Sequence, residues 1–70
     1  MILTESVKTE ILNYCKDNDV KGIDIAEVNE EVLDFLLDEG HVDLSDDEDG
    51  DAYEELSNLV WEFIEENIDL

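Results

Sequence analysis

The hydrophobic positions of this chain recur at helical spacing in three separate segments. In the first segment, apolar side chains fall at i, i+4, i+7 and i+8, and Thr4 is placed to cap the helix start. These positions are Val7, Ile11, Tyr14 and Cys15. The run from Asp17 to Gly22 is expected to end the helix.

Two further helices are predicted, and each opens on an acid pair with the spacing of a capping box. Asp24 and Glu27 form the first pair, and Asp51 and Glu54 form the second. In such a pair, each side chain can accept from a free backbone amide of the other residue. The second helix should stop near Gly40. The inward positions are Ile25, Val28, Val32, Phe35 and Leu36 on the second helix, and Tyr53, Leu56, Val60, Phe63 and Ile64 on the third.

Two short apolar pieces, residues 2–3 and 42–44, lie outside these helices. They are expected to form either a minimal two-stranded ribbon or two short extended tails. The sequence thus predicts one mainly α domain over residues 1–70, built from three helices, with a flexible acidic loop at residues 45–51. Such a small domain is marginally stable on its own.

The apolar stripes of the second and third helices are too wide for one small core. Leu33 and Leu37 lie away from the main inward face of the second helix, while Trp61 and Ile68 lie on the flank of the third. Either the second helix is central and covered on two sides, or these four residues form a homodimer interface. We favour the homodimer at this point, because a partner stabilises a marginal fold by mass action.

Charge changes this picture, because the chain has a formal net charge of -20 at pH 7. Nineteen carboxylates and no lysine or arginine follow Gly22, so Lys8, Lys16 and Lys21 all fall in the first third. A compact domain of this length is roughly 30 Å across, and about 17 phosphate charges of duplex DNA occupy that span. The chain therefore carries about the charge of the duplex that it could replace.

The carboxylates are expected to gather on the outer faces of the two later helices and on the loop before the third. Like charges at i, i+4 destabilise their own helix, and a solvated face would serve equally well with mixed signs. We therefore expect these residues to bind a basic protein. The candidate residues are Glu27, Glu30, Glu31, Asp34, Asp38, Asp46, Asp47, Glu48, Asp49, Asp51, Glu54, Glu55, Glu62, Glu65 and Glu66.

Other chemistry is weakly represented. His41 has no companion that would make it catalytic, and Cys15 is the single cysteine, so neither an enzyme nor an internal disulfide is predicted. The acidic runs before Gly22 and Gly50 are similar to EF-hand loops but lack the glutamate at position 12, so no metal or other cofactor is expected. No apolar run spans a bilayer and no leader is present, which favours the cytoplasm.

In its shortness, acidity and charged helix faces, the chain resembles the small DNA-mimic proteins of bacteriophages. The resemblance is one of class and implies an inhibitor that occupies the basic DNA-binding groove of a host protein, in the host cytoplasm or nucleoid. A nucleoid-associated protein of the HU type is the first expected target, because such proteins bind DNA largely through its backbone and deformability. Direct binding to nucleic acid or membrane is not expected. The alternatives are a degenerate calcium-binding helical module and an acidic adaptor or antitoxin.

Overall fold

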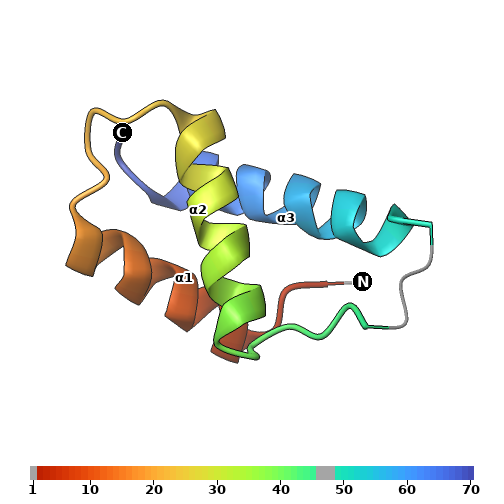
Figure 1. The fold of residues 1–70 in the computed structure, drawn as a ribbon. Helices are drawn as coiled ribbons and strands as arrows, with labels where there is room; N and C mark the ends of the chain where they lie inside the picture. The colour runs from red at the N-terminus through yellow and green to blue at the C-terminus, as the bar shows by residue number, and fades with distance from the viewer. Residues whose placement is uncertain (1, 46–48) are drawn as a thin grey trace.

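The structure is a computed structural model that describes residues 2–45 and 49–70, and three helices make up most of them (Figure 1). They are α1 (Glu5–Asn18), α2 (Ile25–Asp38) and α3 (Asp51–Asn67). Within the described residues there is no strand. Figure 1 shows α2 running across both α1 and α3. The predicted mainly α fold with three helices is confirmed.

The core forms where α2 meets the other two helices. Each helix contributes apolar side chains at the predicted spacing, and Val20 joins them from the α1–α2 connection. Burying these side chains is the main favourable term in folding. The buried apolar residues are Val7, Ile11, Cys15, Val20, Val28, Val32, Leu33, Leu36, Leu56, Val60 and Ile64.

The width of the apolar stripe on α2 has a simple explanation in this arrangement. Leu33 is only 2% exposed, because α2 is covered on two sides by α1 and α3. Leu33 therefore belongs to the wide apolar stripe because α2 is the central helix, and not because it forms a homodimer interface. The inward position predicted for Tyr53 is wrong: it lies in the first turn of α3, where its side chain is 40% exposed.

Thr4 and Asp24 cap α1 and α2 as predicted, but the predicted reciprocal Asp24–Glu27 capping box does not form, and α3 has no side-chain cap within the described residues. Thr4 Oγ1 accepts from the Val7 amide at 3.2 Å, and Asp24 Oδ1 accepts from the Ala26 amide at 2.9 Å. At α3 the cap is Gly50, and Asp51 is already helical, so the predicted Asp51–Glu54 capping box does not open this helix. Gly50 has a φ of 81°, a conformation that disfavours a side chain. Asp51 instead places its charge in the first turn, where the helix dipole favours anions.

The end of α2 is a Schellman motif centred on Gly40. The His41 amide donates to the Leu36 carbonyl at 2.9 Å, and the Gly40 amide donates to the Leu37 carbonyl at 3.2 Å. Gly40 adopts a φ of 75°, which this motif requires. The predicted stop near Gly40 is thus confirmed, and the motif turns the following chain back toward α1.

Aromatic and polar contacts join that turn to α1. The rings of Tyr14 and Phe35 have centroids 4.7 Å apart, and Phe35 lies 5.3 Å from the His41 ring. His41 Nε2 is 3.5 Å from Glu10 Oε2. Neither residues 2–3 nor residues 42–44 are in a strand. Leu3, Val42 and Leu44 pack partly against the core, whereas Ile2 is 82% exposed.

One polar contact crosses the α2–α3 interface. Asn29 is 5% exposed and donates from Nδ2 to Ser57 Oγ at 3.0 Å. Its Oδ1 accepts no hydrogen bond from the part of the chain that the structure describes. Because a buried unpaired acceptor costs free energy, this asparagine is not optimal for stability alone.

We expect the substitution Leu36→Ala to lower the free energy of unfolding by about 2 to 5 kcal/mol, since Leu36 is fully buried and its truncation leaves a cavity in the core. Urea unfolding followed by circular dichroism measures the loss. The matched control is Ile2→Ala, because Ile2 is 82% exposed and its truncation should change stability by less than about 0.5 kcal/mol. Equal losses in the two variants would contradict the described core.

Stability should fall in alkali because of two neighbouring groups on α1. Burial raises the pKa of the Cys15 thiol above its ordinary value of 9.0. Burial, followed by the negative charge of Glu31, raises the pKa of Tyr14 above 10.0. A raised folded-state pKa means that the folded chain holds the proton more tightly, so this stability is complete below the ordinary pKa and is lost as pH rises through the folded one.

The measurement is the free energy of unfolding in urea between about pH 8 and about pH 11. We expect a decline that begins near pH 9.0 in the native chain and is markedly shallower in the double variant Tyr14→Phe with Cys15→Ala. An equal decline in both proteins would show that these two groups do not cause it.

Candidate acidic binding surface

The outer side of α2 carries one row of carboxylates. Its apolar residues pack inward against α1 and α3, so the remaining positions, on the opposite side, face solvent. Every candidate acid on this helix is exposed. We call this row the α2 stripe, and its members are Glu27, Glu30, Glu31, Asp34 and Asp38.

A second row, the α3 stripe, lies on α3 opposite the buried Leu56, Val60 and Ile64. All of its acids are exposed. At its edge, Trp61 is 37% exposed, and its indole Nε1 donates to Glu65 Oε2 at 3.4 Å. The members of the α3 stripe are Asp51, Glu54, Glu55, Glu62, Glu65 and Glu66.

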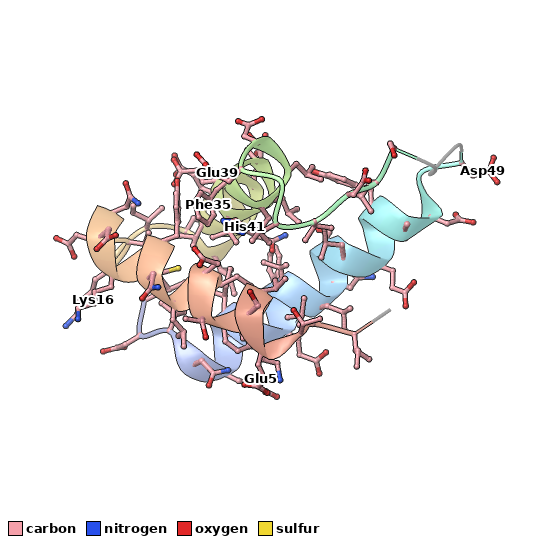
Figure 2. The ribbon with its side chains drawn as sticks, turned by 90° about the horizontal axis from the view of Figure 1, so that it is seen from below. Glu5, Lys16, Phe35, Glu39, His41 and Asp49 are labelled. Carbon is pink, nitrogen blue, oxygen red and sulfur yellow. The ribbon has the colours of Figure 1, made fainter. Side chains whose placement is uncertain are left out.

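The two stripes point to different sides of the molecule. Each lies opposite the apolar face of its helix, and those apolar faces meet in one core, so the acids project outward on both sides of it. Figure 2 shows carboxylate oxygens projecting around the ribbon, with Asp49 and Lys16 at opposite ends. Asp49 is exposed just before α3, whereas the predicted loop members Asp46, Asp47 and Glu48 lie outside the described residues.

The chain offers little compensation for this charge. Lys8 Nζ is 3.8 Å from Glu5 Oε1, and Lys21 Nζ is 4.0 Å from Asp69 Oδ2. Both pairs are largely exposed, and such pairs contribute little to stability. The last turns of α2 and α3 contain no basic residue, although cations are favoured there by the helix dipole. The charge pattern is therefore unfavourable for the fold itself.

The segment before the loop contains a local turn. The Ser45 amide donates to Asp43 Oδ1 at 2.9 Å, and this hydrogen bond holds the pKa of Asp43 below its ordinary value. The interaction is the Asx turn expected of an aspartate two residues before an amide. Ser45 thus lies in a turn, as a loop serine does.

The described residues contain no group of three or more histidine, cysteine, aspartate or glutamate side chains arranged to hold a metal ion. The calcium-loop similarity before Gly22 therefore rests on sequence alone. The run before Gly50 includes residues 46–48, which are outside the described part.

The four residues expected at a homodimer interface differ in exposure and do not form one exposed patch. Leu33 is inside the core, Leu37 is half-buried, and Ile68 packs partly against the core. Trp61 remains at the surface beside the α3 stripe. A second copy could contact Leu33 only if the core opened. Leu33 is therefore not part of a homodimer interface of the folded chain, contrary to the prediction.

Some exposed acids were not among the candidates. Glu39 caps the end of α2, and Asp69 pairs with Lys21 beyond α3. Both lie at helix ends, which sequence patterns place less well than helix interiors. Counting every acid after Gly22 would have included them.

None of the helices in residues 2–45 and 49–70 combines the length and apolar composition needed to cross a membrane. Comparison with protein families, curated proteins and solved structures gives no match to this chain. Its acidic surface must therefore be interpreted from its own geometry and charge.

Proposed function

We propose that this protein is a DNA mimic that binds the basic DNA-binding surface of a host protein and so prevents that protein from binding DNA. The first target to test is a nucleoid-associated protein of the HU type, in the cytoplasm of the host. The observation that carries this proposal is the match between size and charge. The molecule is 34 Å long, and its net charge is -20. About 20 phosphate charges occupy 34 Å of duplex, at one per 1.7 Å.

The position of the acids supports the same function. Proteins that bind DNA through its backbone gain much of their affinity from lysine and arginine contacts to phosphate, largely without reading sequence. The arginine guanidinium pairs with carboxylate as it does with phosphate. The α2 stripe and the α3 stripe are exposed and lie on helices of the folded chain, so their carboxylates are positioned before a target arrives.

The outward direction of the two stripes favours one kind of target. A flat basic surface can contact one stripe at a time, whereas a groove or a pair of arms that surrounds duplex DNA can contact both. Proteins that bend and wrap DNA hold it in this second way. This geometry is the reason to begin with an HU-type protein.

The first experiment measures displacement of a labelled DNA duplex from a purified HU-type protein. We expect the acidic protein to displace the duplex, and we expect a higher concentration to be needed as salt rises, because salt screens the charge contacts. If displacement fails, the chain should be incubated with bacterial lysate, with and without competing duplex. If competing duplex prevents capture of a protein, that protein becomes the new target and the DNA-mimic proposal stands. If duplex does not affect capture, the DNA-mimic proposal is overturned.

A second experiment neutralises four exposed acids with near-isosteric amides. The variant E30Q/D34N/E62Q/E66Q should bind the target about tenfold to a hundredfold more weakly, because rim charges each contribute modestly to affinity. The two halves should be tested separately. Similar losses from E30Q/D34N and from E62Q/E66Q would indicate a target that contacts both stripes, and loss from only one would indicate a flat surface.

The matched control removes four charges outside the stripes, as E5Q/D17N/D19N/E39Q. It has the same net charge as the first variant, and all four residues are exposed. A mimic whose stripes contact the target should lose much less affinity in the control. Equal losses would mean that net charge alone attracts the target, without a positioned surface. The single tryptophan, Trp61, lies beside the α3 stripe, so its fluorescence offers a direct signal of binding there.

A further inference from the structure

An open pocket of about 240 Å³ lies between α1 and the end of α3. From α1, its lining includes Leu12 and Lys16, and from the chain after α3, Ile68 and Asp69. Leu12 is 43% exposed, although it is a large apolar side chain. No residue of α2 lines the pocket. We call the pocket, together with the adjoining side of α1, the α1–α3 groove.

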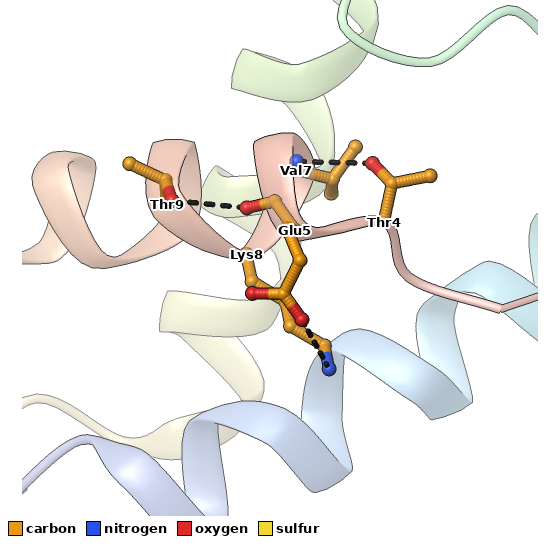
Figure 3. A network of polar contacts seen from close by, with 5 residues as sticks. All are labelled: Thr4, Glu5, Val7, Lys8 and Thr9. Atoms are coloured by element: carbon orange, nitrogen blue, oxygen red, sulfur yellow. Dashed lines mark hydrogen bonds and ion pairs between the residues drawn. The ribbon is translucent and has the colours of Figure 1, made fainter.

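The α1–α3 groove also gathers the positive charge of the chain. Lys16 and Lys21 line the pocket. Lys8 lies four residues before Leu12 and therefore on the same side of α1. Figure 3 shows the Lys8 side chain reaching from α1 in the direction of α3, paired with Glu5. These three residues are all the lysine and arginine in the sequence.

Acids in the groove balance these lysines. Glu5 pairs with Lys8, Asp69 pairs with Lys21, and Asp19 lines the pocket beside Lys16. The groove is thus close to neutral in a chain of net charge -20, and both signs are present within it. A basic partner gains less here than at the α2 stripe or the α3 stripe, because it would meet the lysines.

We infer that the α1–α3 groove is a homodimer interface, in which the groove of one copy packs against the same groove of a second copy. Two molecules of net charge -20 repel each other, and they can approach at lowest cost where each presents both signs. In a two-fold contact, the lysines of one copy face the acids of the other, and the exposed Leu12 side chains are buried. The α2 stripe stays outside the contact, since α2 does not line the pocket.

This dimer does not depend on DNA mimicry, and salt separates the two inferences. Salt screens both the few lysine–acid pairs of the contact and the overall repulsion between two copies of net charge -20, and the repulsion is the larger effect, so the dimer should become tighter as salt rises. Salt also screens the attraction between the acidic stripes and a basic target, so that complex should become weaker. A failure of one inference therefore leaves the other open to its own measurement.

The test is the solution mass, measured by sedimentation equilibrium over a dilution series at low and moderate salt. The monomer has a mass of 8.0 kDa, and we expect a mass near twice that value at high protein concentration. The variant Leu12→Glu should raise the dissociation constant at least about tenfold, since it places a charge in the contact. Lys16→Glu should act in the same direction by removing one complementary charge.

The matched control is Ile2→Glu, which adds the same charge to an exposed apolar residue that does not line the pocket. It should dimerise nearly as well as the native chain. Circular dichroism would establish that each variant is folded before its mass is compared. A native chain that stays at 8.0 kDa at every concentration and salt would overturn the inference. Equal weakening by Leu12→Glu and Ile2→Glu would also overturn it.

Discussion

The packing of α2 against both α1 and α3 is the interaction on which the rest of the molecule depends. It holds together a core of eleven buried apolar residues in the described part of the chain, and it must do so against the mutual repulsion of a net charge of -20. Both α1 and α3 pack against α2, and residues of all three helices belong to one core. The same packing also decides which sides of α2 and α3 face solvent, and so where the carboxylates lie.

The charge pattern lowers the stability of the fold at several positions where a single basic residue would have raised it. Lysine at i, i+4 from a glutamate would add support to α2 and α3, and a basic residue in the last turn would suit the helix dipole. Neither occurs on these two helices. Features that lower stability and persist throughout a surface are typical of residues that serve binding, and this is the physical basis of the proposed mimicry.

Much of the fold could be predicted from the sequence because its signals are local. Thr4 and Asp24 act as caps as predicted, and the 3.6-residue periodicity identifies Ile11, Val32 and Val60 as buried. The misses occur where local signals compete or where distant segments meet. At α3, an acid pair with capping-box spacing suggested a start at Asp51, but Gly50 can adopt a positive φ and takes the cap position instead.

The candidate acidic surface could be predicted within each helix, but the arrangement of the helices relative to one another could not. Amphipathic periodicity correctly places both acidic stripes on the solvent side of their helices. It does not indicate how α2 crosses α3, so the burial of Leu33 and the different directions of the two stripes emerge only in three dimensions. The α1–α3 groove was missed for the same reason, since Leu12 and Ile68 are far apart in the sequence and meet only at the end of the bundle.

The hydrogen bond between Asn29 and Ser57 has a consequence for charge spacing. A shift of α2 along α3 would disturb the packed apolar core, and it would also separate these two polar side chains and leave the buried Asn29 without its partner. This uncharged contact therefore adds to the apolar packing that fixes the register of the two helices. Through that register it helps to set how far each carboxylate on α2 stands from those on α3, as the sugar–phosphate backbone sets the interval between phosphates in a duplex.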